Sequence, residues 1–190
     1  MRRSLPNVLL ILCLVAANRG RADASPLRRL ARRLRPQIVN GVLTSDFPTT
    51  GALLGGSSFS TASLQCSGTL IGCQTFLTAG HCVEGDLNPA HYSVFFQHAG
   101  FFAVQSIALH PSYNFPVGDV AVLKLATAVT GIAPTPINAT AAIAPGTAAT
   151  IAGFGRTGGS GSDYGLKRYG AVTTATCTTG ISGATSVCWN

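Results

Sequence analysis

Residues 78–83 read Thr-Ala-Gly-His-Cys-Val, and this stretch carries more information than any other part of the chain. It follows the apolar run Thr75-Phe76-Leu77, which is typical of a short strand, and it places His81 directly before Cys82. Another cysteine, Cys66, lies sixteen positions before Cys82. A histidine held still by a strand and a cross-linked cysteine is well placed to act as a general base.

The positive charge of the chain is confined to its N-terminal part. The 190 residues have a formal net charge of +7. Residues 1–37 contain nine arginines against one acid, a net +8, whereas residues 38–190 contain four basic against five acidic side chains, a net −1. Because the body is nearly neutral, the basic isoelectric point predicts no nucleic-acid partner.

Residues 1–24 have the composition of a secretory signal peptide. Arg2 and Arg3 give a charged start, residues 8–17 form a ten-residue apolar run, and residues 22–24 offer small side chains at the cleavage position. The run is shorter than the about 20 residues of a membrane span. We therefore predict a secreted, extracellular protein without a stable membrane anchor; the alternative for the run is a short buried helix.

Residues 25–37 form an Arg-rich block that we predict to be a pro-segment. Leu27, Leu30 and Leu34 share one helical face, and we expect the arginine pairs between them to be processing sites. A solvated linker and an amphipathic helix on an anionic membrane are the alternatives.

Residues 38–190 are long enough for one ordinary domain, and their pattern is all-β. Short apolar runs are separated by Gly and Pro, and we find no helix-period segment of useful length, no repeat and no heptads. A single helical turn at residues 80–85 is expected to carry His81. The strands are expected at residues 66–71, 75–79, 92–98, 101–109, 120–125, 149–154 and 165–176.

The cysteines favour disulfides over a metal site. Cys13 leaves with the predicted signal peptide, and disulfides are the default for an exported chain. No CxxC motif is present and no histidine lies at zinc-ligand spacing from a cysteine, so we predict neither a metal nor a cofactor. The remaining number is odd, so either one thiol is free or its partner lies outside this sequence. The five are Cys66, Cys73, Cys82, Cys177 and Cys188.

His81 and Asp119 have the chemistry of a base and its orienter. A neutral imidazole can face a hydroxyl with one nitrogen and donate to a carboxylate with the other. Asp119 precedes the apolar run 120–125, where a carboxylate is costly to bury unless a group donates to it. Taken singly, the histidine is more often structural and the aspartate more often a turn residue. Their combination in one chain favours the chemical interpretation.

Three motifs in order resemble the trypsin/chymotrypsin-like serine peptidase family: residues 38–41 (Ile-Val-Asn-Gly), 78–82 (Thr-Ala-Gly-His-Cys) and 119–125 (Asp-Val-Ala-Val-Leu-Lys-Leu). Shorter segments are similar to the same family throughout residues 38–190. They are residues 66–71, His110-Pro111 with Tyr113, 136–138 and 151–156.

The resemblance implies two six-stranded antiparallel β-barrels with the site in the cleft between them. The first barrel would cover about residues 38–128, and the second, incomplete in this chain, about 134–190. His81 would be the catalytic base and Asp119 its orienter, both from the first barrel. The second barrel would supply the serine nucleophile, the oxyanion hole and the specificity pocket.

The same resemblance implies the cross-links and the activation site. It pairs Cys66 with Cys82 and Cys177 with Cys188. It also makes Ile38 the N-terminus that activating cleavage releases.

The sequence departs from the family in several places. It lacks the Gly-Asp-Ser-Gly-Gly signature; Ser160 and Ser162 lie in what resembles a variable loop, too early in the chain for the nucleophile. We therefore expect a chain truncated before the serine segment and inactive by itself. Gln37 and Pro36 precede Ile38, so self-activation by a trypsin-like cut is not expected, and an outside peptidase, or trimming from Arg33, is needed.

The favoured hypothesis is a secreted serine endopeptidase that acts on proteins or peptides, of whose triad only His81 and Asp119 are present. An activating peptidase and a protein inhibitor are further candidate partners, and a monomer is expected. The alternatives are a catalytically inactive homologue that acts as a secreted protein-binding domain, and a plain secreted β-domain with a structural disulfide. Cleavage specificity does not follow from these residues, because those that line the specificity pocket are absent.

Overall fold

The computed structural model describes residues 10–12, 38, 41–56, 60–139, 141–157, 164–183 and 186–190. Most of the predicted signal peptide and the whole predicted pro-segment lie outside these residues, as do Ser160 and Ser162.

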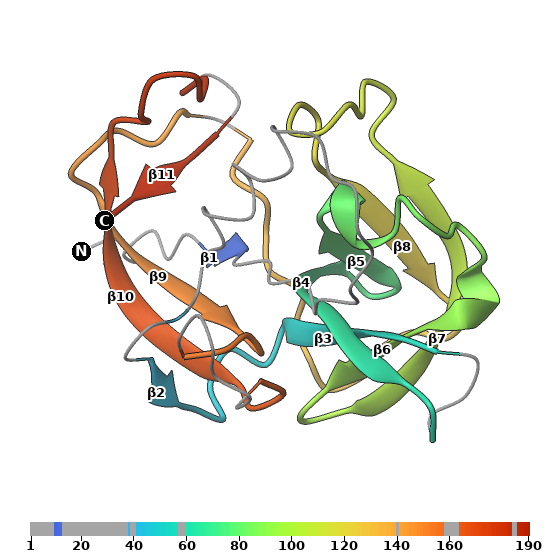
Figure 1. The fold of residues 1–190 in the computed structure, drawn as a ribbon. Helices are drawn as coiled ribbons and strands as arrows, with labels where there is room; N and C mark the ends of the chain where they lie inside the picture. Colours follow the sequence, from blue (N-terminus) through green and yellow to red (C-terminus); the bar gives the residue numbers. More distant parts are fainter. Residues whose placement is uncertain are drawn as a thin grey trace.

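The described chain is built from β-strands and short 3₁₀ turns, which confirms the all-β prediction (Figure 1). The strands are β1 (Leu10–Leu12), β2 (Val42–Leu43), β3 (Thr50–Gly55), β4 (Ser63–Gly72), β5 (Thr75–Thr78), β6 (Tyr92–Phe96), β7 (Gly100–Leu109), β8 (Ala121–Leu125), β9 (Ala148–Gly153), β10 (Arg168–Ala175) and β11 (Cys188–Trp189), and the turns are η1 (Gly80–Cys82) and η2 (Pro89–His91).

Six strands close into an antiparallel barrel in the order β3-β4-β5-β8-β7-β6, on the right of Figure 1. Alternation along the strands decides which side chains fill it. In β8, Ala121, Leu123 and Leu125 are buried, whereas Lys124 between them is exposed. The barrel therefore has a packed apolar core. Its largest fully buried side chains include Leu53, Leu70, Phe76 and Phe96.

A second, open sheet lies beside the barrel, on the left of Figure 1. Its strand order is β1-β9-β10-β11, and β2 pairs with β10. A closed six-stranded barrel with a second sheet is the chymotrypsin-like architecture, as predicted. Ile38 packs with Ala149 and Ile151 in the small core of this sheet and is only 2% exposed.

One pairing departs from the antiparallel expectation. β1 pairs with β9 in parallel, with Leu10 opposite Thr150 and Leu12 opposite Ala152. An edge strand offers unpaired backbone N–H and C=O groups to any extended segment, and an apolar run meets that need. The strand that adds to β9 here comes from the region that the composition assigns to the signal peptide.

The barrel and the sheet meet through an apolar cluster on the outside of the barrel. Phe154, directly after β9, packs with Ala52 of β3 and Leu64 of β4, and all three are buried. Phe95 of β6 adds a ring whose centroid lies 6.4 Å from that of Phe154. This cluster fixes the end of β9 against the barrel wall.

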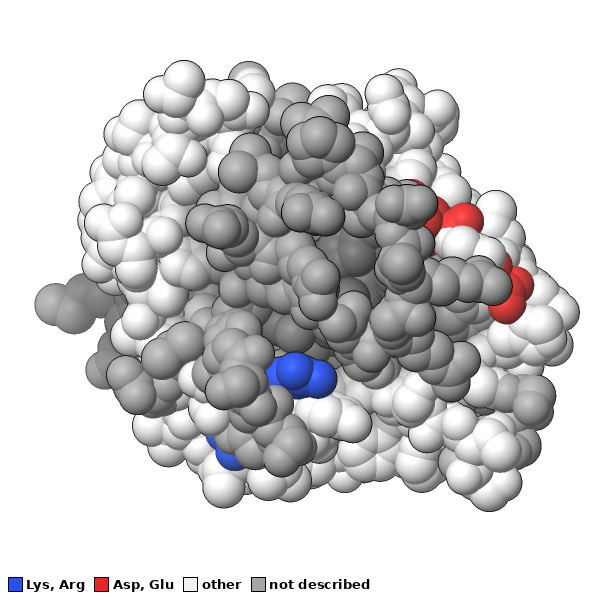
Figure 2. Space-filling view, in the orientation of Figure 1, with Lys and Arg blue, Asp and Glu red and all other residues white. Residues whose placement is uncertain are grey.

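Among the described residues, few charged groups are visible on the face shown in Figure 2, in keeping with the nearly neutral body. Acidic atoms lie at the right, over the barrel, and basic atoms lie near the centre and lower left. Within the described ranges, no helix is long and apolar enough to cross a membrane.

Gly68 of β4 is required by close packing inside the barrel. A methyl group at this position would lie 2.3 Å from the Phe76 ring and 2.5 Å from the carbonyl oxygen of Leu77. The carbonyl belongs to the neighbouring strand β5, so it has no rotamer by which to move away.

We expect Gly68→Ala to destabilise the domain by about 1–3 kcal/mol, because overpacking forces the backbone of β5 to shift. Gly85→Ala is the matched control, since a methyl group there meets nothing within 4 Å. Its effect should stay within about 0.5 kcal/mol. Urea unfolding followed by circular dichroism measures both, and equal midpoints for the two variants would contradict this packing.

Candidate active site

The pairing of β5 with β8 brings the two candidate residues together. Thr78, the last residue of β5, lies opposite Ala121, the first of β8. His81 follows Thr78 by three positions on η1, and Asp119 precedes Ala121 by two. Antiparallel neighbours place the end of one strand beside the start of the next. Residues 38 positions apart in sequence therefore meet at one end of the barrel.

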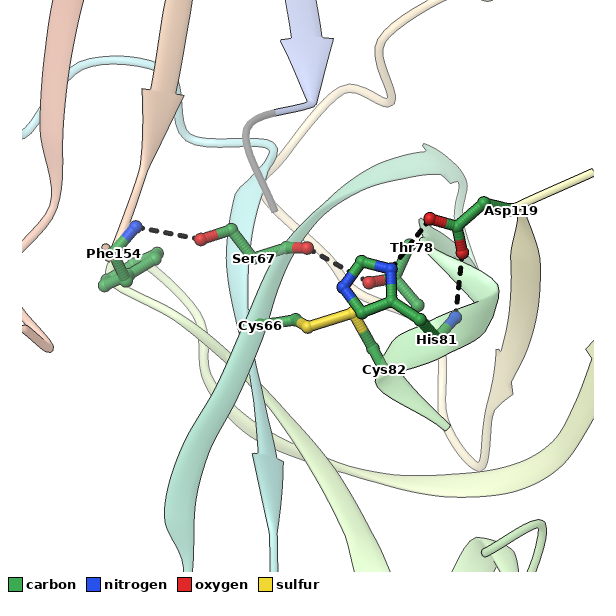
Figure 3. Close-up of a disulfide and its surroundings, with 7 residues drawn as sticks. All are labelled: Cys66, Ser67, Thr78, His81, Cys82, Asp119 and Phe154. Carbon is green, nitrogen blue, oxygen red and sulfur yellow. Dashed lines mark hydrogen bonds and ion pairs between the residues drawn. A yellow bond between two sulfur atoms is a disulfide. The ribbon is translucent and has the colours of Figure 1, made fainter. Parts of the chain in front are cut away.

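Asp119 holds His81 at two points (Figure 3). The backbone N–H of His81 donates to Oδ1 of Asp119 at 2.8 Å, and the Nδ1 atom of the ring lies 2.7 Å from Oδ2. One contact fixes the backbone and the other fixes the ring, so the imidazole cannot turn without losing a charge-assisted hydrogen bond.

The carboxylate of Asp119 also fixes the tautomer of the ring. Burial alone would raise the pKa of Asp119, but hydrogen bonds from the His81 ring and from the backbone N–H groups of His81 and Gly80 outweigh it, so the pKa lies below its usual value. An ionised carboxylate only accepts, so in the neutral ring Nδ1 carries the proton and Nε2 has the lone pair. The side chain of His81 is 25% exposed, so part of the ring is open to solvent.

Gly80 lets Asp119 and the loop before it approach the turn. A methyl group at Gly80 would lie 2.5 Å from the ring of Tyr113 and 3.4 Å from Oδ1 of Asp119. The Tyr113 hydroxyl donates to Glu84, which follows the same turn. The residues on both sides of η1 are thus packed against the loop that carries Asp119.

A disulfide fixes the turn from its other side. Cys66 of β4 and Cys82 of η1 are joined, with their Cα atoms 6.2 Å apart (Figure 3). Cys66 is 1% exposed and belongs to the barrel core. His81 is therefore held between a cross-link to β4 and a hydrogen-bonded carboxylate before β8.

An aromatic wall borders the ring. Phe115 meets His81 edge-on, with ring centroids 5.8 Å apart. Phe115 is itself exposed, so its ring offers an apolar surface beside the imidazole. The sequence did not predict the contact between Phe115 and His81, because residues 111–118 form a loop without regular hydrophobic periodicity.

The grouping of Cys66, His81 and Cys82 places three potential metal ligands within 4.8 Å of one another. Both sulfurs are consumed by the disulfide, so neither is available as a thiolate. The residues present at this point therefore do not fit a metal ion.

The other expected residues belong to other elements of the fold. Cys177 and Cys188 form the second disulfide, at the start of β11. Cys73 is exposed with a free thiol. Ile38 is buried in the second sheet, with its carbonyl accepting from the N–H of Gly41.

Ser67 and Phe154 join the site although neither was singled out from the sequence. The hydroxyl of Ser67 accepts from the backbone N–H of Phe154 at 2.9 Å, and its carbonyl accepts from the hydroxyl of Thr78 at 3.0 Å. The only sequence feature that could have pointed to Ser67 is its position directly after Cys66. No local pattern shows that it reaches a residue 87 positions away.

Comparison with known proteins agrees with this geometry. The family model described as Trypsin matches residues 39–189. The chain is 30% identical over 172 residues to trypsin alpha-4 of Lucilia cuprina, covering 85% of this chain and 64% of that protein. It is 32% identical over 157 residues to chymotrypsin-like elastase family member 1 of Bos taurus, covering 63% of this chain and 57% of that protein.

The chain spans about three fifths of the length of these two relatives. The family match nevertheless covers the closed barrel and strands β2, β9, β10 and β11 of the second sheet. The histidine–aspartate pair, the cross-linked turn and the matched range together place this chain in the trypsin-like serine peptidase family.

Proposed function

We propose that this chain carries the base and the orienting acid of a secreted serine endopeptidase. The observation that supports it most directly is the double contact of Asp119 with His81, at 2.8 Å to the backbone and 2.7 Å to the ring. That contact leaves Nε2 as the basic atom at a partly exposed position. Membership of the trypsin family supports peptide-bond hydrolysis as the reaction.

In the proposed reaction, Nε2 of His81 removes the proton from a serine hydroxyl while the oxygen attacks the carbonyl carbon of a peptide bond. The imidazolium that forms is stabilised by the Asp119 carboxylate, whose low pKa keeps it charged. His81 then gives its proton to the leaving amine, and the acyl-enzyme is hydrolysed by water through the same base.

The serine is proposed to come from a segment that is not among these 190 residues. No Gly-Asp-Ser-Gly-Gly sequence occurs in the chain. Without a nucleophile, a triad enzyme loses on the order of 10⁶ in kcat. We therefore propose that the 190-residue chain is inactive by itself. Protein or peptide substrates would be cut only by a longer gene product that includes the serine segment, called the longer product below.

Secretion and activation belong to the same proposal. The leader composition at residues 1–37 and the disulfides Cys66–Cys82 and Cys177–Cys188 suit an exported zymogen. Ile38 is proposed as the N-terminus released by an outside peptidase. The chain is proposed to act as a monomer without a nucleic-acid partner.

The absence of the serine signature favours one alternative, a catalytically inactive homologue that binds proteins outside the cell. The retained geometry of His81 and Asp119 weighs against it, because a binding domain has no use for an oriented base.

The deciding experiment has two parts. The transcript is sequenced beyond codon 190, and the longer product and the 190-residue chain are each treated with a fluorophosphonate probe, which labels a reactive serine. We expect a Gly-Asp-Ser-Gly-Gly reading frame, labelling of the longer product and none of the 190-residue chain. In the longer product, His81→Ala should lower kcat by about 10⁶ and Asp119→Asn by about 10⁴. A genuine stop codon with normal secretion would favour the binding domain, and labelling of the 190-residue chain would refute the missing nucleophile.

The lowered pKa of Asp119 predicts a pH-dependent contribution to stability. A carboxylate whose pKa is below its unfolded value of 3.8 stabilises the fold above that value and loses the contribution as the pH falls through the folded pKa. As the pH falls from about 5 to below 3.8, thermal unfolding should therefore show a steeper loss of stability for the wild type than for Asp119→Asn. Parallel curves for the two proteins would show that the contacts with His81 do not stabilise the charged form.

A further inference from the structure

The proposed site is divided between two parts of the fold, which raises the question of what holds them in register. His81 and Asp119 belong to the closed barrel, whereas the remaining groups are proposed to come from the part that contains β9 and β10. Catalytic groups must be held within about 0.5 Å of their productive positions. A contact between the two parts close to His81 is therefore a candidate for control of that distance.

Ser67 makes such a contact on the outer face of the barrel. In the β3–β4 pair, Leu53 faces Cys66 in the core, so the next pair, Ala52 and Ser67, faces outward. Ser67 is nevertheless only 2% exposed, because Phe154 covers this face. Its hydroxyl accepts from the N–H of Phe154 at 2.9 Å (Figure 3).

The backbone N–H of Phe154 depends on that hydroxyl. The pairing of β9 with β10 ends at Gly153, opposite Arg168, so the ladder does not extend to Phe154. The Phe154 residue is 3% exposed. A buried N–H without an acceptor is costly, and the Ser67 hydroxyl satisfies it.

Ser67 reaches the base-bearing segment in a second direction. Its carbonyl accepts from the hydroxyl of Thr78, the last residue of β5, at 3.0 Å. Its chain neighbour Cys66 is joined to Cys82 beside His81. Figure 3 shows the resulting series of contacts, which runs from Phe154 through Ser67 and Thr78 toward His81.

Two neighbouring hydroxyls show that burial on this face does not by itself provide a partner. Thr50 and Thr69 lie opposite each other in the same strand pair, two positions along from Ala52 and Ser67 and on the same face. Both are buried, and among the residues that the structure describes neither hydroxyl has a hydrogen-bond partner. The contact of Ser67 with Phe154 is therefore specific to its position.

We propose that Ser67 is a positioning residue that sets the second sheet relative to the segment carrying His81. The hydroxyl fixes the backbone at the end of β9, and the carbonyl fixes the end of β5. The catalytic meaning of this role rests on the proposed function, but the mechanical coupling does not.

The test compares Ser67→Ala with the matched control Thr69→Val, which removes a buried hydroxyl that has no partner. Spin labels on the free Cys73 of the barrel and on Thr173→Cys, an exposed position of β10, report the distance between the two parts. Double electron–electron resonance should give one narrow distance for the parent protein and for Thr69→Val. Ser67→Ala should broaden or shift it.

Amide hydrogen exchange separates positioning from general destabilisation. In Ser67→Ala the N–H of Phe154 should exchange about tenfold faster or more, because its acceptor is lost, while the N–H of Phe76 in the barrel core should change much less. Equal acceleration at both amides would assign Ser67 a purely structural role. An unchanged distance distribution, or the same change in Thr69→Val, would also overturn the proposal.

The longer product separates this proposal from the proposed function. If it is a peptidase, Ser67→Ala should lower kcat with little change in KM, since the variant displaces the base and not the bound substrate. If it has no activity, the proposed function fails while the distance and exchange results still decide the role of Ser67.

Discussion

The pairing of β5 with β8 is the constraint on which the site depends. Thr78 lies opposite Ala121, so the turn after one strand and the residue before the other are neighbours. Asp119 then donates no hydrogen bond and accepts several, from the His81 ring and from the backbone of the same turn. A partly buried carboxylate is stable in that position only because these donors are present. The strand register therefore determines both the contact and the direction in which the imidazole points.

The closed barrel holds His81 and Asp119 in fixed positions. Within the described residues, the disulfide, the close contact at Gly80 and the Asp119 carboxylate all restrain His81. Restraint of this kind lowers the reorganisation needed when a proton is transferred. The groups proposed to come from the second sheet must be aligned with His81 and Asp119. The hydrogen bond from the N–H of Phe154 to the hydroxyl of Ser67 joins that sheet to the barrel. This division is consistent with a site that forms where two sheets meet.

The local signals in the sequence predicted the barrel strands β4 to β8 within a few residues, and the helical turn that carries His81. The approach of Asp119 to His81 was expected from the chemistry of a base and its orienter and from the family resemblance, not from these strand signals. β3 was missed because its sequence, Thr-Gly-Ala-Leu-Leu-Gly, begins and ends with small residues and lacks alternation. Its small residues are explained only by packing, since Gly51 faces the rings of Phe76 and Phe96. The contact of Ser67 with Phe154 and the pairing of β1 with β9 join distant segments, and no local pattern encodes them.

The central claim is that Asp119 orients His81 so that Nε2 is the basic nitrogen. Nitrogen NMR of the ¹⁵N-histidine-labelled protein at neutral pH tests this claim most directly, because protonated and unprotonated ring nitrogens give separate resonances. The account predicts that the neutral His81 ring carries its proton on Nδ1 and not on Nε2, and that Asp119→Asn abolishes this preference. A neutral His81 ring with its proton on Nε2 in the unmodified chain would contradict it.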